Sequence, residues 1–135
     1  MNYLSLFSGI EAATVAWHPL GWTPVAFSEI DKTASKFLAE TYPHVPNLGD
    51  VTKITEEMVK SLGKIDLIIF GSPCQDLSIA GKQRGLDGAR SGLFRDSIRI
   101  IQWARKQCGL RFALWENVPG AYSSNKGRDF AEVVA

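Results

Sequence analysis

The sequence predicts an α/β fold in which a parallel sheet is flanked by helices. Strand and helix patterns alternate along the chain, and the candidate strands are apolar almost throughout, as in parallel sheets covered on both faces. No internal repeat, low-complexity tract or linker interrupts this alternation. The chain has 135 residues, of which 45% are hydrophobic, so we expect at most one domain with a substantial core and right-handed crossovers.

The first half of the chain contains two predicted strand–helix units. We expect strands at Tyr3 to Ser8 and Thr23 to Ser28, and helices from about Glu11 to His18 and over Lys32 to Thr41. Asp31 is a suitable N-cap for the second helix. Residues 43–50 are expected to form a loop or a short strand.

The second half continues the same alternation. Its predicted elements are a helix capped by Thr55 and ending near Gly63, a strand at Ile65 to Phe70, a long loop over 77–92, a helix from Leu93 to Gln107 and a strand at Arg111 to Glu116. A further helical pattern begins at Gly127 and has no stop signal before Ala135. We therefore expect a domain that is incomplete at its C-terminus.

Composition excludes several classes of protein. The net charge of +1 gives no indication of nucleic-acid binding, although basic residues cluster between Lys82 and Lys106. On charge alone, an ordinary solvated helix face explains this cluster equally well. With only Cys74 and Cys108, a disulfide scaffold and a metal site are not expected. No signal peptide or long apolar run is found, which predicts a cytoplasmic protein.

Two strand ends carry candidate catalytic groups. Cys74 follows the strand at 65–70 in the segment Gly-Ser-Pro-Cys-Gln, beside a basic loop that would favour its thiolate. Glu116 ends the strand that begins at Arg111. Open α/β sheets place ligands outside the carboxyl ends of their strands. A thiol and a carboxylate at that position suggest covalent catalysis assisted by an acid. Cys108 resembles an ordinary buried cysteine.

Three other positions suggest a nucleoside site, although each has an ordinary explanation. The turn after the first strand contains Gly9, and its backbone N–H groups would face a ligand, but an ordinary βα turn is the more frequent case. Glu29 follows Gly9 by twenty residues, a spacing typical of a carboxylate that binds ribose hydroxyls or, equally, of a helix cap. Asp50 suits an adenine amino group or a simple turn.

Taken together, these segments resemble the DNA (cytosine-5)-methyltransferases in order and over nearly the whole chain. The matching segments are Leu6 to Ile10, Ser28 to Asp31, Gly49 to Val51, Gly71 to Gln75, Ser78 to Arg90, Gly92 to Phe94 and Glu116 to Val118. The resemblance implies a Rossmann-like, S-adenosylmethionine-dependent methyltransferase fold. It also implies methyl transfer to carbon 5 of cytosine in DNA.

The resemblance assigns roles to particular residues. Cys74 would form the covalent adduct and Glu116 would donate a proton, with Gln75 and Asn117 beside them. The expected S-adenosylmethionine residues are Phe7, Ser8, Gly9, Ile10, Glu29, Ile30, Asp50, Val51, Pro73 and Leu93. The expected DNA-contacting loop residues are Ser78, Lys82, Arg84 and Arg90, which would close over a flipped-out cytosine. No metal is implied.

Some features depart from the family pattern. Ser5, Glu11 and Ala12 occupy positions where the family commonly has Asp and two glycines. The target recognition region and the segment that completes the cofactor pocket are absent, so we expect activity to need sequence missing from this chain, such as a complementing C-terminal chain that carries target recognition. Two alternatives are a catalytically inactive fragment that binds S-adenosylmethionine or a partner, and an unrelated thiol enzyme.

Overall fold

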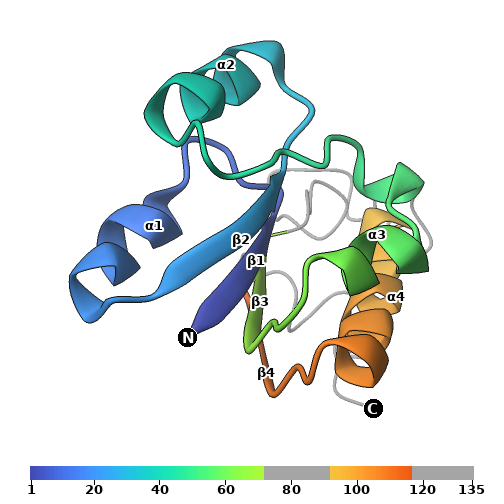
Figure 1. The fold of residues 1–135 in the computed structure, drawn as a ribbon. Helices are drawn as coiled ribbons and strands as arrows, with labels where there is room; N and C mark the ends of the chain where they lie inside the picture. The colour runs from blue at the N-terminus through green and yellow to red at the C-terminus, as the bar shows by residue number, and fades with distance from the viewer. Residues whose placement is uncertain (72–91, 117–135) are drawn as a thin grey trace, which may run out of the picture.

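The computed structural model describes residues 1–71 and 92–116. In chain order its elements are β1 (Asn2–Leu6), α1 (Ala12–Trp17), η1 (His18–Leu20), β2 (Thr23–Ser28), α2 (Lys32–Thr41), η2 (Val51–Lys53), α3 (Glu56–Ser61), β3 (Leu67–Phe70), α4 (Gly92–Gln107) and β4 (Phe112–Trp115) (Figure 1). The predicted loop over 77–92 and the predicted helix from Gly127 lie almost entirely outside the described residues.

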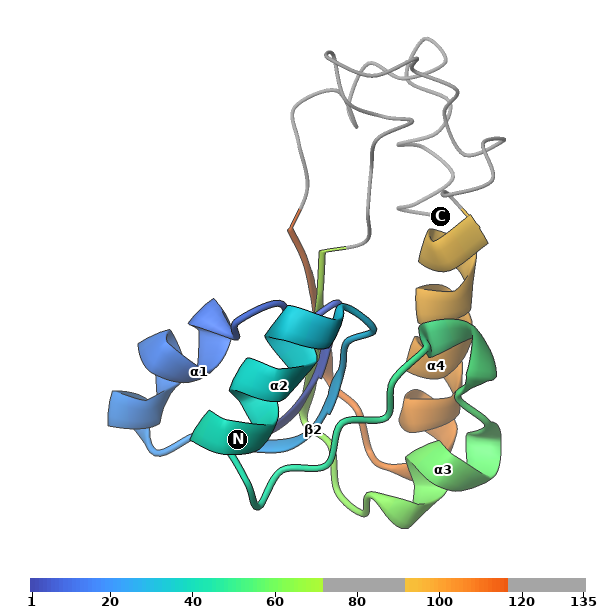
Figure 2. The ribbon, with the colours of Figure 1, turned by 90° about the horizontal axis from the view of Figure 1, so that it is seen from above.

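The four described strands form one parallel sheet in the order β2-β1-β3-β4. Viewed from above, α1 and α2 lie on one side of the strands and α3 and α4 on the other (Figure 2). The chain passes from β1 to β2 on one side and then returns to place β3 on the other. A topological switch point therefore lies between β1 and β3, where ligands bind in open α/β sheets.

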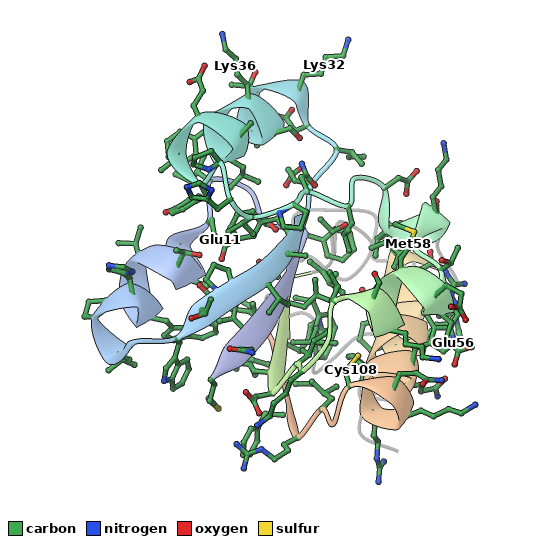
Figure 3. The ribbon with its side chains drawn as sticks, in the orientation of Figure 1. Glu11, Lys32, Lys36, Glu56, Met58 and Cys108 are labelled. Carbon is green, nitrogen blue, oxygen red and sulfur yellow. The ribbon has the colours of Figure 1, made fainter. Side chains whose placement is uncertain are left out.

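The main core fills the space between the sheet and the α3–α4 layer. Leu4 and Ile68, from the two central strands, are fully buried together with Ile100 of α4. Cys108 is also buried, and its Sγ donates to the Val59 carbonyl oxygen at 3.3 Å, which agrees with the expected packing role (Figure 3). Helix α4 is amphipathic and ends in Arg105 and Lys106, whose charges suit its C-terminal dipole.

The predicted elements agree with the structure apart from a few local differences. The bounds of β2 and α2 are as expected, and the Asp31 side chain caps α2 by accepting from the Ala34 N–H at 2.8 Å. Helix α1 stops earlier than predicted, because Pro19 lies in a short 3-10 turn that follows it. The 3-10 turn η2 was not predicted; it is capped by Asp50. Residues 43–50 contribute only a single bridge, between Asn47 and Phe27.

Strand β4 corrects the expectation that every strand is covered on both faces. Phe112 is 52% exposed and Leu114 is 47% exposed, although the strand is apolar. The reason is its place at the edge of the four described strands, where it pairs only with β3. Among the described helices, none is long and apolar enough to cross a membrane.

Candidate active site at the carboxyl edge of the sheet

The register of the strands brings four sequence-distant residues to one edge of the sheet. Leu6 aligns with Ser28 and Phe70, and Phe70 aligns with Trp115. The residues that follow these positions are, in the order of the strands, Glu29, Phe7, Gly71 and Glu116. Phe7, Glu29 and Glu116 are predicted site residues, and Gly71 belongs to a segment that was singled out from the sequence. Parallel pairing places all four side by side at one edge of the sheet. This edge is the candidate site.

The Glu29 carboxylate accepts hydrogen bonds from the backbone that follows β1 and from the backbone that follows β2. Its Oε1 accepts from the Gly9 N–H at 2.8 Å, and its Oε2 accepts from the N–H groups of Ile30 and Asp31 at 2.9 and 2.8 Å. A carboxylate offers about four acceptor positions, so about one stays available for a ligand hydroxyl. Glu29 is therefore more than an exposed strand-end carboxylate, because it ties the first turn to the second.

The turn after β1 is wound unusually tightly. Phe7, Gly9 and Glu11 all have positive φ angles, of 55°, 58° and 67°. For Phe7 and Glu11 such a conformation costs about 1–3 kcal/mol each, and such outliers gather at binding sites. Ser8 closes the turn, with its N–H donating to the Ser28 carbonyl oxygen at 3.1 Å and its Oγ donating to the Ser5 carbonyl oxygen at 2.9 Å. The turn is thereby fixed to both strands.

Glu11 does not face the edge of the sheet, because its side chain is buried in the core. Only 1% of it is exposed, and Ser5 Oγ donates to its Oε2 at 2.7 Å (Figure 3). Burial raises the pKa of this carboxyl above its usual range, although hydrogen bonds from Ser5 and Thr14 act in the opposite direction. Its Oε1 has no hydrogen-bond partner among the described residues. Ser5 and Glu11, two of the residues that depart from the family pattern, therefore form one buried hydrogen-bonded pair.

Asp50 and Val51 lie beside the turn, but one carboxylate oxygen of Asp50 already accepts two hydrogen bonds. Asp50 Oδ1 accepts from Thr52 N and from Thr52 Oγ1 at 2.9 and 2.7 Å, and the bond from this hydroxyl is the largest cause that lowers the pKa of the Asp50 carboxyl. Val51 is buried, and Ser28 Oγ donates to the Gly49 carbonyl oxygen at 2.7 Å. Asp50 therefore acts as the turn residue that the sequence left open as an alternative.

A small cavity of about 30 Å³ lies among these segments, lined by Phe7, Ser28, Glu29, Ile30, Gly49 and Val51. This volume accommodates a water molecule but not a nucleoside. Ile10 and Ile30 are 67% and 72% exposed. A nucleoside would therefore lie over the edge and cover such exposed apolar surface, rather than enter the cavity.

At the other end of the row, Glu116 lies against Gly71. A Cβ added to Gly71 would come within 2.9 Å of Glu116 Oε2, so a side chain at this position would press on the carboxylate. The Glu116 N–H also donates to the Phe70 carbonyl oxygen at 3.0 Å. Because Gly71 precedes Cys74 by only three residues, the carboxylate lies at the start of the segment that carries the thiol. Glu116 is exposed.

An aromatic cluster packs around the strand ends that lead to Gly71 and Glu116. Phe70 stacks on Trp115 with a centroid distance of 6.4 Å, and Phe94 of α4 contacts the same indole at 5.1 Å. Leu93, a predicted cofactor residue, is half-buried and packs against the core at the start of α4. The strand ends that lead to Gly71 and Glu116 are thus fixed by large rings, which lose little entropy when ordered.

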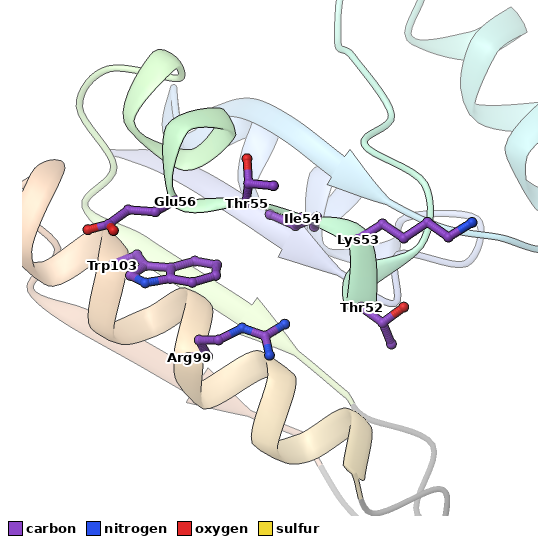
Figure 4. Close-up of a pocket in the computed structure, with 7 residues that line it drawn as sticks. All are labelled: Thr52, Lys53, Ile54, Thr55, Glu56, Arg99 and Trp103. Atoms are coloured by element: carbon purple, nitrogen blue, oxygen red, sulfur yellow. The ribbon is translucent and has the colours of Figure 1, made fainter.

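A second and larger hollow lies away from this edge, between α4 and residues 52–56 (Figure 4). It measures about 660 Å³ and is lined by Thr52, Lys53, Ile54, Thr55, Glu56, Arg99 and Trp103. Several of its polar groups already have partners: Arg99 forms an ion pair with Asp96 at 2.9 Å, and Thr55 caps α3. It contains no residue predicted from the sequence for the cofactor or for catalysis.

Of the predicted site residues, the structure brings together Phe7, Ser8, Gly9, Glu29, Ile30 and Val51, and it places Gly71 beside Glu116. The predicted residues outside the described part of the chain are Pro73, Cys74, Gln75, Ser78, Lys82, Arg84, Arg90 and Asn117. Sequence reasoning missed Asn47, whose side chain bonds to both Glu29 and Gly49. Its only signal was its place three residues before Asp50. Within residues 1–71 and 92–116, no three His, Cys, Asp or Glu side chains gather as a metal site would require.

Comparison with solved structures gives the class of fold. The S. pombe Dnmt2 methyltransferase superposes with a TM-score of 0.73 and 18% identity, covering 99% of this chain and 41% of that one. An E. coli prophage protein described as a putative DNA modification methyltransferase gives a TM-score of 0.72 and 27% identity, covering 99% of this chain and 38% of that one. The chain has the Rossmann-like α/β fold of these methyltransferases, as predicted.

Sequence comparison gives the family. The family described as C-5 cytosine-specific DNA methylase matches residues 1–135, and the chain belongs to it. Type II methyltransferase M2.BsuMI of Bacillus subtilis is 37% identical, over 95% of this chain and 32% of its own length. M.AquIA of Picosynechococcus is 33% identical, over 93% of this chain and 51% of its own length.

A phage P1 relative carries a different description. It is named a DNA N-6-adenine-methyltransferase and is 42% identical over 90% of this chain, but the match covers 17% of its length. The chain thus spans between about a sixth and a half of these three relatives.

Proposed function

We propose that this chain carries the cofactor-binding and catalytic part of an enzyme that methylates carbon 5 of cytosine in DNA, with S-adenosylmethionine as the methyl donor. The observation that carries the proposal is the row Glu29, Phe7, Gly71 and Glu116 at the switch-point edge of the sheet. One end of this row offers the remaining acceptor position of the Glu29 carboxylate to a nucleoside. The other end places a carboxylate at the start of the segment that carries Cys74.

The residues present fit S-adenosylmethionine. Glu29 keeps about one acceptor position for a ribose hydroxyl, and the exposed Ile30 beside it offers apolar surface for adenine. Phe7 to Ile10 would hold the methionine end, and Asp50, Val51, Pro73 and Leu93 would complete the contacts. When bound, S-adenosylmethionine supplies an electrophilic methyl group. Glu11 is buried and so does not present its carboxyl to the ligand.

In the proposed mechanism, cytosine is activated by residues of this chain. The Cys74 thiolate adds to carbon 6, while Glu116 donates a proton to ring N3, which makes carbon 5 nucleophilic. After carbon 5 is methylated, loss of its proton and departure of the thiolate restore the ring, and N3 returns its proton to Glu116. Gln75 and Asn117 would orient these groups. The target base must first leave the duplex, and Ser78, Lys82, Arg84 and Arg90 would contact phosphates as the loop closes.

The first test is calorimetric titration of the 135-residue chain with S-adenosylmethionine, because this step needs no DNA recognition. We expect binding, and we expect Glu29→Ala to weaken it by about 1–3 kcal/mol, the cost of leaving a hydrogen-bonding partner unmatched. Absence of binding by a chain shown to be folded, or an unchanged affinity in the variant, would contradict the proposed site.

The second test is covalent trapping on DNA that contains 5-fluorocytosine. We expect an adduct that Cys74→Ser abolishes and Cys108→Ser preserves, since Cys108 is buried in the core. Cofactor affinity should stay within a few-fold of wild type in Cys74→Ser. Cofactor binding without a Cys74-dependent adduct, even after target-recognition sequence from a relative has been supplied, would favour the inactive binding fragment. The comparisons offer no support for a natural complementing chain.

A further inference from the structure

We propose that Asn47 is a positioning residue that fixes Glu29 in the orientation needed to bind the cofactor, an inference that rests on the proposed function. Asn47 lies in the segment between α2 and η2 and forms a single bridge with Phe27 of β2. Its side chain reaches the residue that follows β2. No role was predicted for it from the sequence.

The Asn47 amide uses its full hydrogen-bonding capacity. Oδ1 accepts from Glu29 N and from Gly49 N, both at 3.0 Å. Nδ2 donates to the Glu29 carbonyl oxygen and to Ser35 Oγ, both at 3.2 Å. An amide has two donors and a carbonyl oxygen with two lone pairs, so each position is occupied. Such a fourfold arrangement selects asparagine, because aspartate lacks the donors.

These bonds fix Glu29 where regular secondary structure does not. Glu29 lies between the end of β2 and the cap of α2, and Asn47 bonds to both its N–H and its carbonyl oxygen. The carboxylate of Glu29 is meanwhile bonded to Gly9, Ile30 and Asp31. The backbone of Glu29 is thus held from one side and its side chain from the other, leaving little freedom to turn away from a ligand.

Asn47 also joins the two halves of the nucleoside site. By accepting from Gly49 N it fixes the residue before Asp50, and Ser28 Oγ reinforces the link by donating to the Gly49 carbonyl oxygen. One side chain therefore sets the spacing between the proposed ribose-binding carboxylate and the proposed adenine-binding segment. Because Asn47 is exposed, water competes for its bonds and the free energy involved is that of about one ordinary hydrogen bond.

The test is a double-mutant cycle on S-adenosylmethionine affinity, measured by calorimetry. We expect Asn47→Ala to weaken binding about three- to tenfold. Asn2→Ala is the matched control: this asparagine lies at the start of β1, its amide makes only a 3.4 Å bond to Lys64 O, and affinity should not change. In a Glu29→Ala background, Asn47→Ala should cause little further loss, since residues that act through one another are not additive.

A second measurement is independent of the ligand. In hydrogen exchange, the amides of Glu29 and Gly49 should lose protection in Asn47→Ala but not in Asn2→Ala. Wild-type affinity in Asn47→Ala, or an equal penalty in both backgrounds, would overturn the positioning role while leaving the proposed function intact. Failure of the wild-type chain to bind S-adenosylmethionine would overturn the proposed function and this inference with it.

Discussion

Replacement of Glu29 by Gln is the most direct perturbation of the candidate site, because it preserves size, removes the negative charge and replaces one acceptor oxygen by an NH2 donor. The carboxylate now accepts from Gly9 N through one oxygen and from Ile30 N and Asp31 N through the other. The amide of Gln has a single oxygen. If that oxygen keeps the bonds to Ile30 and Asp31, the amide nitrogen faces the Gly9 N–H, and two donors oppose each other.

The magnitude follows from the bond that is lost. An unsatisfied donor costs about 1–3 kcal/mol, and the half-buried position of Glu29 allows water to recover part of this, so we expect about 1 kcal/mol. For a chain of this size, such a loss lowers Tm by roughly 3–6 °C. Affinity for S-adenosylmethionine should fall about tenfold or more, because the remaining acceptor position is also lost.

The assay is thermal unfolding at pH 7 with and without S-adenosylmethionine, together with calorimetric titration. Glu40→Gln serves as the control, since this glutamate is exposed in the last turn of α2 and lies outside the site. Its Tm should stay within about 2 °C of wild type and its affinity should not change. A Glu29→Gln variant that unfolds at the wild-type temperature and binds with wild-type affinity would refute the reasoning.

Three further predictions concern other residues. Burial raises the pKa of Glu11 in the folded state above the usual glutamate value of about 4.3. Between these two pKa values the unfolded state has released the proton and the folded state has not, so the free energy of unfolding should fall as pH rises through this window. Glu11→Gln should remove this fall, as measured by urea denaturation. Parallel pH profiles for the two proteins would contradict the raised pKa of the buried carboxyl. Gly71→Ala should displace the Glu116 carboxylate and slow adduct formation about tenfold or more, with stability within ~0.5 kcal/mol of wild type, whereas Gly92→Ala, whose Cβ meets nothing within 4 Å, should leave adduct formation unchanged. Equal rates in both variants would separate Glu116 from the reaction. Cys108 should react with a maleimide only after unfolding, because it is buried and its raised pKa disfavours the thiolate; labelling of Cys108 in the native state, detected by peptide mass, would show that the core opens there.

The comparison of prediction and structure is most instructive at the first turn. The sequence predicted a strand, a turn and a helix there, because apolar runs, glycine and caps act over a few residues, but the strand ends at Leu6 and not at Ser8. It did not show where the Glu11 side chain points. That direction depends on the left-handed backbone at Glu11 and on Ser5 Oγ, which meet only when strand and helix pack together.

The order of strands and helices, the parallel sheet and the polar residues that follow the strand ends could all be predicted, because each depends on a local pattern of apolar residues, glycines and helix caps. The tertiary structure decided which of those residues meet. Parallel pairing of segments more than sixty residues apart aligns Phe7 with Gly71, and the same sheet sets Gly71 beside Glu116. It also decided that the Asn47 side chain hydrogen-bonds to Glu29 and that β4 is exposed at the edge of the four described strands. The physical reason is that hydrogen-bond partners and burial depend on neighbours across the sheet, which local patterns do not specify.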